Sequence, residues 1–333
     1  MAVTDTLRRR ASAVKSQVRR MRTLAFVVTS WNAGRRGAAR GLPGVVFGRY
    51  GRSLGWRMRR QGLPVWFSYV VTPVNCVRYF EFAFALETIS RSPASSYLDV
   101  GSPRLLSLFV AEHDPQARIR VINPDLRDSR ETAEIASALG IRGLEVESLR
   151  VEELRGQPQR YDCIWCLSVV EHIPGPEGDR DAVRVMYDLL ADGGSLVLTF
   201  PVDRTMWLEY RAQDVYGLSQ EQAAGGEYFF QRFYDAGAIE ERLLGSPGSR
   251  AAVMRWYGET TPGWFAEYEQ RWMQQGDSCT AQDPIAMAEN FREYASWGDM
   301  PGMGVCGMII KKPQPTSNRL ARSDVDSLVT PTS

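Results

Sequence analysis

The sequence predicts a doubly wound α/β fold, in which a mostly parallel sheet carries helices on both faces. Between residues 95 and 202, apolar segments of strand length alternate with amphipathic segments of helix length. Such alternation is typical of β–α–β units, whose strands lie parallel in one sheet. The chain of 333 residues is also long enough to bury the core that this fold needs.

Each element can be placed on the chain by its pattern. Short apolar segments predict strands at 96–101, 117–123, 144–149, 161–168 and 195–201. Amphipathic segments predict helices at 73–90, 104–113, 129–139, 179–191 and 228–244. Two final strands are expected at 250–257 and 303–311, with an aromatic insertion near 258–300 between them. The aromatic residues at 207–297 are expected either to cover an apolar substrate as a lid or to form ordinary core.

Charge is distributed unevenly along the chain. Residues 1–60 contain fifteen Lys and Arg and one acid, Asp5, and so carry +14, although the whole chain carries only +1. Few aromatic side chains lie between these basic residues, so the segment lacks a base-stacking platform and no specific nucleic-acid partner is expected. A solvated tail and a peripheral contact with an anionic membrane through residues 1–60 are the two alternatives.

Composition divides the chain into three parts. Residues 1–62 are expected to be a basic N-terminal arm, helical at 7–28 and with little regular structure at 33–62. Residues 63–312 are expected to form the α/β domain. The polar residues 313–333 are expected to be a disordered tail.

The cysteines indicate a reducing compartment, because the five are odd in number and scattered, so a cytoplasmic protein is expected. Cys163 and Cys166 form a C-x-x-C pattern, but they lie on a predicted strand. Side chains three residues apart on a strand face opposite sides of the sheet. The pair is therefore predicted to lie in the core and to bind no metal.

The first predicted strand ends in Asp99-Val-Gly101, and a helix follows at once. A strand that turns directly into a helix through glycine leaves backbone N–H groups unpaired and lets a ligand approach the backbone. Nucleotide-type cofactors use such a loop. The second and third glycines that often complete the motif are replaced by Ser102-Pro-Arg104.

Other motifs follow this loop in a characteristic order. An acid, Asp125, follows the second strand, and Tyr161-Asp162 opens the fourth, which ends in Ser168-Val-Val-Glu-His-Ile-Pro174. Leu189-Leu-Ala-Asp-Gly-Gly-Ser-Leu196 precedes the fifth. In this order the motifs resemble the class I S-adenosylmethionine-dependent methyltransferases, specifically the broad type 11 small-molecule group. The resemblance implies a Rossmann-like, seven-stranded sheet whose last strand is antiparallel, with helices at the N-terminal side.

The resemblance also implies a cofactor and its contacts. S-adenosylmethionine is the expected cofactor, and the residues expected to bind it are Asp99, Gly101, Ser102, Asp125, Leu126, Ser168 and Val169. Asp125 is expected to accept hydrogen bonds from the ribose hydroxyls. Its alternative role is that of a turn or helix-start acid, and Asn123 is then the ribose contact.

His172 is the candidate catalytic base, since a histidine after the fourth strand can accept a proton near neutral pH. Its alternative role is to shape the loop. A related metal-using group has Glu-x-x-Glu-His here, but Ser168 replaces the first glutamate, so no metal is expected. Arg150 stands about where the family has an aspartate that binds the adenine amine, and an arginine accepts no hydrogen bond.

The expected function is methyl transfer from S-adenosylmethionine to an O, N or C nucleophile of a small molecule, natural-product or lipid-like. Two alternatives remain open. The atypical first loop and Arg150 favour a binding or regulatory protein that keeps the fold without methyl transfer. The basic arm favours a peripheral membrane enzyme that methylates a lipid. The sequence does not identify the acceptor.

Overall fold

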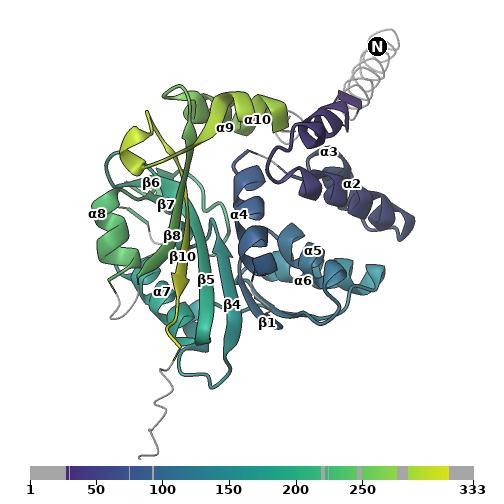
Figure 1. Cartoon of the computed structure of the whole chain (residues 1–333), viewed down its shortest axis with the longest axis horizontal. Coiled ribbons are helices and arrows are strands. Elements are labelled where there is room, and N and C mark those ends of the chain that lie inside the picture. Colours follow the sequence, from purple (N-terminus) through teal and green to yellow (C-terminus); the bar gives the residue numbers. More distant parts are fainter. Residues whose placement is uncertain are drawn as a thin grey trace, which may run out of the picture.

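The computed structural model describes residues 28–29, 31–74, 76–91, 94–218, 222–223, 225–245, 250–275 and 284–314. The helix expected at 7–28 and the tail expected from 313 lie almost wholly outside these residues. The described part of the chain is built on one large sheet with a helical layer on each face, beside a small two-stranded sheet (Figure 1).

Within the described residues, eight strands form a mixed sheet in the order β3-β2-β1-β4-β5-β10-β8-β9. Their bounds are Ser96–Val100 (β1), Arg118–Ile122 (β2), Leu144–Glu147 (β3), Tyr161–Leu167 (β4), Leu190–Val202 (β5), Ala251–Glu259 (β8), Phe291–Tyr294 (β9) and Gly304–Lys311 (β10). The first five strands pair in parallel, and β10 is antiparallel to both of its neighbours. The doubly wound sheet with an antiparallel last strand is confirmed, and β9 adds one edge strand to the seven expected.

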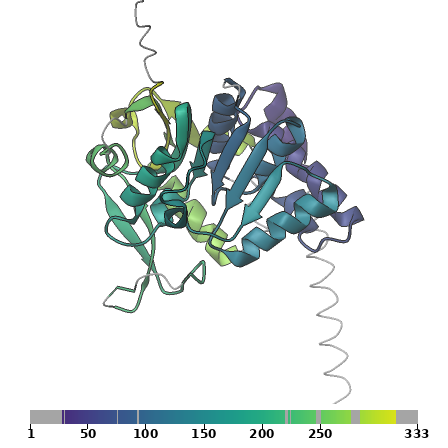
Figure 2. The ribbon, with the colours of Figure 1, turned by 90° about the horizontal axis from the view of Figure 1, so that it is seen from below.

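Helices cover both faces of the sheet (Figure 2). On one face lie α2 (Val45–Arg60), α3 (Trp66–Val71), α4 (Arg78–Arg91), α5 (Leu105–His113) and α6 (Leu126–Leu139). The other face is covered by α7 (Gly178–Asp188), the short helix α8 (Ala236–Ala238) and the turns η1 (Val151–Leu154) and η3 (Ile239–Leu243). Two further helices, α9 (Trp264–Gln275) and α10 (Pro284–Asn290), lie between β8 and β9 in the chain.

Strand β4 shows why the sheet needs both layers. Its side chains alternate between two apolar clusters, so that Cys163 and Trp165 face the α2–α6 layer while Ile164 and Cys166 face α7. All four are fully buried. A strand buried on both faces reads as a continuous apolar run. The prediction that Cys163 and Cys166 occupy opposite sides of the sheet is confirmed.

The segment 33–62 contains more regular structure than the sequence analysis expected. Residues 31–39 are helical and α2 continues to Arg60. Phe47, Leu54 and Met58 of α2 are fully buried in the main core cluster. The helix was not predicted because its glycines are typical of turns and loops. In the structure their small size lets α2 pack closely, since a Cβ at Gly51 would meet Pro73 at 2.4 Å. Residues 45–60 are thus part of the domain and not of a separate arm.

The helix predicted at 228–244 was wrong over its first half. Residues Tyr228–Phe233 form β7, which pairs with β6 (Trp207–Arg211) in a two-stranded sheet. Only the end of the segment is helical, in α8 and η3. The run Tyr-Phe-Phe-Gln-Arg-Phe is rich in aromatic residues, which favour strands over helices. Residues 251–259 and 304–311 confirm the two predicted final strands.

The sheet has a topological switch between β1 and β4, where the chain order reverses. Ligands of doubly wound folds lie beyond the carboxyl ends of the strands at such a point. The residues that follow β1 and β4 here are Gly101 and Ser168. The functional site is therefore expected between these two loops.

Candidate functional site

The loop after β1 is held by the buried carboxylate of Asp99. One of its oxygens accepts a hydrogen bond from the Ser102 backbone N–H at 3.0 Å, and the other accepts one from the Ser107 hydroxyl. Burial raises the pKa of Asp99 to about 6. The Ser102 hydroxyl in turn accepts a hydrogen bond from the Leu167 backbone N–H at 2.9 Å, which ties the β1 loop to β4. Asp99 and Ser102, both predicted site residues, thus stabilise the loop after β1.

Gly101 provides the close approach that the loop needs. Its φ is +62°, in the left-handed region, and a Cβ there would lie 3.2 Å from the Val169 side chain. Glycine alone adopts this conformation without strain. A larger residue would narrow the space between the β1 and β4 loops.

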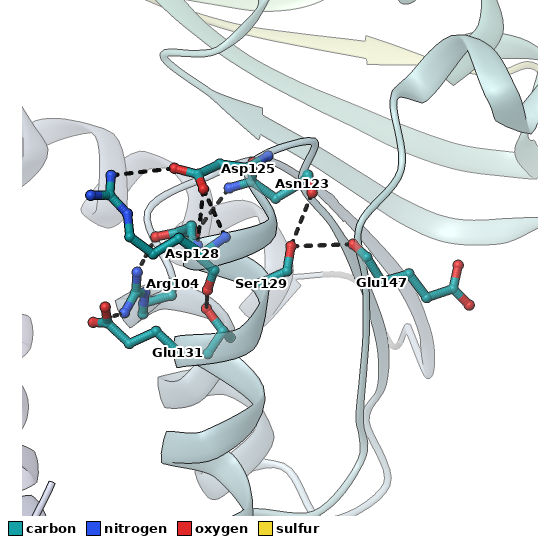
Figure 3. Close-up of polar contacts among 9 residues, drawn as sticks. Arg104, Asn123, Asp125, Asp128, Ser129, Glu131 and Glu147 are labelled. Atoms are coloured by element: carbon teal, nitrogen blue, oxygen red, sulfur yellow. Dashed lines mark hydrogen bonds and ion pairs between the residues drawn. The ribbon is translucent and has the colours of Figure 1, made fainter. Parts of the chain in front are cut away.

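A polar network follows β2 and forms a second wall (Figure 3). Asp125 caps α6 by accepting hydrogen bonds from the backbone N–H groups of Arg127 and Asp128. The Asn123 side chain donates to Asp128 at 2.9 Å and accepts from the Asp125 backbone N–H at 2.9 Å. Arg104, from the β1 loop, forms ion pairs with Asp128 and Glu131 of α6. Asp125 therefore is the helix-start acid that the sequence analysis gave as its alternative role.

A cavity of about 320 Å³ lies between these walls. Of the predicted site residues, it brings together Gly101, Ser102, Asp125, Ser168, Val169 and His172. Asp99 is not among its lining residues, because its carboxylate is turned into the loop. Leu126 is 50% exposed and also lies outside the cavity. Asn123 lines it as well.

The far end of this cavity contains both a basic and an acidic side chain. Arg150 lines it and donates a hydrogen bond to the Leu218 carbonyl at 3.4 Å. Glu152, in the turn η1 that follows, also lines the cavity. The sequence indicated only that Arg150 cannot accept a hydrogen bond. The hydrogen-bond acceptor Glu152, two residues later, was not predicted because the turn between β3 and β4 has no distinctive spacing.

A second cavity, of about 200 Å³, adjoins the first. Its walls are mainly aromatic, from β7 and from the insertion before β10: Phe230, Phe233, Phe265, Tyr268 and Phe291. The expectation that these aromatic residues form ordinary core is confirmed in part, and their role as a lid over a substrate stays a prediction. Phe291 packs in the core and lines this cavity, whereas Trp207 is exposed and stacks on Phe233 at 4.0 Å between ring centroids.

The two cavities share a wall formed by Arg78, Ser168, His172 and Tyr216. Arg78 comes from α4, before the first strand of the sheet, and Tyr216 from the loop after β6. Three segments far apart in the chain thus meet at the end of β4: α4, the loop after β4 and the loop after β6. We refer to the first space as the polar cavity and to the second as the aromatic cavity.

His172 is held firmly in this shared wall. Its Nδ1–H donates to the Phe230 carbonyl at 2.7 Å, which leaves Nε2 as an acceptor, 3.3 Å from the Tyr216 hydroxyl. Burial lowers the pKa of His172 to about 4. The imidazole is therefore neutral at physiological pH and a weak base, suited more to accepting a hydrogen bond than to holding a proton.

Two buried carboxyl groups lie behind the shared wall, and their surroundings differ. Glu81 of α4 accepts hydrogen bonds from the Ser168 hydroxyl, from the Thr199 hydroxyl at 2.9 Å and from Arg78. Glu171 lines the aromatic cavity, and its Oε2 has no hydrogen-bond partner among the described residues. Burial raises the pKa of Glu171 to about 8.

Sequence reasoning missed the parts played by Arg78, Glu81 and Glu171. Glu171 stood beside His172 in the Glu-His-Ile motif, but nothing in the sequence shows that its carboxyl is buried. Arg78 and Glu81 lie three residues apart and so share one face of a helix. That spacing could have indicated a polar patch on an otherwise apolar helix. Within the described residues, no cluster of three or more metal-ligating side chains occurs.

No protein-family model and no curated protein matches the chain. Solved structures similar to it include the [4+2]-cyclase SpnF, with 16% identity over 70% of this chain and 81% of that chain and a TM-score of 0.42. Coclaurine N-methyltransferase, bound to N-methylheliamine and S-adenosylhomocysteine, has 14% identity over 69% of each chain and a TM-score of 0.46. The 1,6-didemethyltoxoflavin-N1-methyltransferase of Burkholderia thailandensis has 16% identity over 79% of this chain and 87% of that chain, with a TM-score of 0.45.

Identities and TM-scores at this level describe a likeness only. The fold is assigned from the sheet itself, whose parallel strands run in the order β3-β2-β1-β4-β5 and whose next strand, β10, is antiparallel. The protein therefore has the Rossmann-like fold that its resemblance to class I S-adenosylmethionine-dependent methyltransferases implies.

Proposed function

We propose that the protein transfers a methyl group from S-adenosylmethionine to a small molecule. One observation carries the proposal: a polar cavity at the switch point of the sheet adjoins an aromatic cavity through a single shared wall. A group-transfer enzyme needs two such spaces, one for the donor and one for the acceptor, with the reacting atoms between them.

The polar cavity has the groups that a nucleoside with a charged amino-acid end requires. Gly101 leaves room against the backbone, and the carbonyl and carboxyl oxygens of Asn123 and Asp125 lie beside it. Glu152 supplies a carboxylate at the end where Arg150 replaces the expected acid. Arg78 supplies a cationic side chain in the shared wall. We assign the ribose to the Asn123 and Asp125 edge and the adenine amine to Glu152.

When bound, S-adenosylmethionine supplies an activated methyl group on a sulfonium. The protein's own contribution is alignment, since a positioned nucleophile gains most of the available rate enhancement from proximity and orientation. Ser168 lies in the wall between the two cavities, and its φ is +48°, an uncommon conformation for serine. Its backbone N–H donates to Thr199, and its hydroxyl donates to Glu81. Val169 lines the polar cavity beside it.

Calorimetric titration with S-adenosylhomocysteine, the product, tests the cofactor site. We expect saturable binding to the wild-type protein and none to Gly101→Val, whose side chain would fill the approach. Gly140→Val is the matched control, because Gly140 has a φ of +68° and a Cβ there meets nothing within 4 Å. Loss of binding in both variants, or in neither, would contradict the assignment.

A binding or regulatory protein without methyl transfer is the alternative function. It is favoured by Asp125, one of whose oxygens is already used to cap α6, and by Arg150. The two proposals differ in product: incubation with methyl-labelled S-adenosylmethionine and a mixture of small acceptors labels a product only under the first. Binding of S-adenosylhomocysteine with no labelled product from any acceptor would favour the second.

We also propose a peripheral contact with anionic membranes through the outer face of α2 and α3. No Asp or Glu occurs between Asp5 and Glu81, so α2 and α3 contain no acidic side chain, although Arg57 of α2 pairs with Glu112 of α5. Trp56 and Phe67 are exposed, and Arg59 lies over the rings of Trp56 and Trp66. Aromatic and basic side chains on one helix face are typical of interfacial helices. No described helix is long and apolar enough to cross a membrane.

Co-sedimentation with vesicles tests the membrane contact. The full chain is expected to bind vesicles containing phosphatidylserine but not neutral ones, and high salt should release it. Trp56→Ala should weaken binding several-fold. Trp207→Ala is the matched control, since Trp207 is 40% exposed and Trp56 is 43% exposed. Equal binding by wild type and Trp56→Ala would refute the role of this face.

A further inference from the structure

Glu171 presents a hydrogen-bonding group that the protein itself does not use. Its side chain is almost fully buried, lines the aromatic cavity and leaves Oε2 without a partner among the described residues. An unpaired buried polar atom is costly, because its desolvation is not repaid by a hydrogen bond. Glu81, in the same wall, shows that the fold can pair a buried carboxylate fully. The unpaired oxygen therefore points to a ligand.

We propose that Glu171 binds the nucleophile of the methyl acceptor, and that this acceptor carries an amine or hydroxyl nucleophile on a single apolar ring. This proposal rests on the proposed methyl transfer and names the substrate class for the same site. Its observations are the size of the aromatic cavity, the nature of its walls and the unpaired oxygen of Glu171.

The size of the aromatic cavity sets the size of the acceptor. The cavity has a volume of about 200 Å³, and an apolar cavity of about 150 Å³ in another protein is known to hold one benzene molecule. The space beside Glu171 thus fits one six-membered ring with a short substituent. Phe230, Phe233 and Phe291 line this space, and aromatic walls favour an aromatic or other flat apolar ring.

The polar end of the cavity selects for a nucleophile that bears a hydrogen. Nε2 of His172 is an acceptor, since Nδ1–H is committed to the Phe230 carbonyl, and it already faces the Tyr216 hydroxyl at 3.3 Å. A carboxylate at Glu171 is likewise an acceptor. Oε2 of Glu171, which has no partner among the described residues, is matched by an N–H or O–H group, whereas a carbon nucleophile would leave it unpaired.

The surroundings of Glu171 explain why its proton affinity is high. The charged and titratable groups around it are Arg78 and Glu81 from α4, Cys166 from β4, the adjacent His172, Tyr216, and Arg232 and Tyr234 from the segment after β6. Burial and the charge of Glu81 raise its pKa, and Arg78 opposes them. With a pKa of about 8, the group exchanges a proton near neutral pH, as an acid–base group must.

The transfer then balances without any further reactant. The lone pair of the acceptor's nitrogen or oxygen forms the new bond to the methyl carbon, and the carbon–sulfur bond breaks with its electron pair remaining on sulfur. The sulfonium thereby becomes a neutral thioether. The N–H or O–H proton passes to the carboxylate of Glu171, which returns it to solvent after release of the product.

Fluorine NMR of three isosteric probes tests the proposal on the full chain without cofactor. The probes are 4-fluoroaniline, 4-fluorophenol and 4-fluorotoluene, which share ring and size but differ in their hydrogen-bond donor. We expect the amine or the phenol to bind about tenfold more tightly than the toluene, the fold-change of one net hydrogen bond. Preference for the amine assigns a nitrogen nucleophile, and preference for the phenol assigns an oxygen nucleophile.

Three variants test whether Glu171 causes the preference for probes with a hydrogen-bond donor. Glu171→Leu should bind all three probes equally, and Glu171→Gln should keep much of the preference because an amide also accepts a hydrogen bond. Glu145→Gln, on the exposed edge strand β3, should match wild type. Equal binding of the three probes to wild type, or an unchanged preference in Glu171→Leu, would overturn the proposal. Because the probes need no cofactor, these results are separate from those of the S-adenosylhomocysteine titration.

Discussion

The substitution Glu171→Gln should change how stability depends on pH. The pKa of Glu171 is raised from 4.5 to about 8 by burial, so the folded state holds a proton that the unfolded state has released between these values. A carboxyl whose folded pKa is raised contributes stability below its unfolded pKa, and that stability is lost as pH rises toward the folded pKa. Glutamine is neutral throughout and should remove this loss.

The contribution of Glu171 to the pH dependence of stability is best separated from that of other groups between pH 6.5 and 8. His172 has its pKa lowered to about 4, and Asp99 has its pKa raised to about 6, so both titrate mainly below this window. One pH unit corresponds to about 1.4 kcal/mol per proton. Allowing for partial ionisation of the folded state near pH 8, Glu171 should lower the free energy of unfolding by between about 1 and 2 kcal/mol across the window.

Urea denaturation at pH 6.5 and at pH 8 provides the measurement, followed by fluorescence of the tryptophans. The wild-type protein is expected to lose this stability between the two pH values, and Glu171→Gln is expected to lose less. The quantity compared is the change in the free energy of unfolding between the two pH values. A destabilisation by glutamine that is equal at both pH values therefore does not affect the result. Glu145→Gln, an exposed residue, should behave as wild type. An equal change for wild type and Glu171→Gln would refute the conclusion that Glu171 is protonated in the folded protein.

Two further predictions concern the elements that hold the site. Asp99→Ala should destabilise the protein by about 2 to 4 kcal/mol in urea denaturation, because the Ser102 N–H and the Ser107 hydroxyl lose a buried charged acceptor; a loss below about 1 kcal/mol would show that the loop does not depend on this carboxylate. A chain that begins at Leu63 should fail to fold by circular dichroism, because it lacks the buried side chains of α2; a cooperative thermal transition in that chain would contradict the packing of α2 as part of the core.

The sheet could be predicted because its sequence signal is local. Apolar segments between amphipathic helices fix the bounds of β1 to β4 within about two residues, and Gly101 marks the first loop. The start of β5 was misplaced, because the strand begins at Leu190 and not at the predicted residue 195. The errors fall where the local pattern is ambiguous or misleading. Residues 228–233 contain aromatic side chains that fit both a buried helix and a strand, and pairing with β6 decides between them.

The site was predicted only in the part that the motifs cover. Gly101, Ser168 and Val169 follow strands whose carboxyl ends meet at one edge, so their proximity follows from topology. Glu171 acquires its properties from α4 and from the segment after β6, which reach it from distant parts of the chain. Such tertiary burial leaves no local signature in a single sequence.

The arrangement of the two cavities is the central claim, and a nuclear Overhauser measurement tests it most directly. S-adenosylmethionine labelled with ¹³C in its methyl group is added to the full chain, and contacts from that methyl group are recorded. We expect contacts to His172 and Tyr216, two of the side chains shared by the polar and aromatic cavities. Bound S-adenosylmethionine whose methyl group shows no contact to either residue would contradict it.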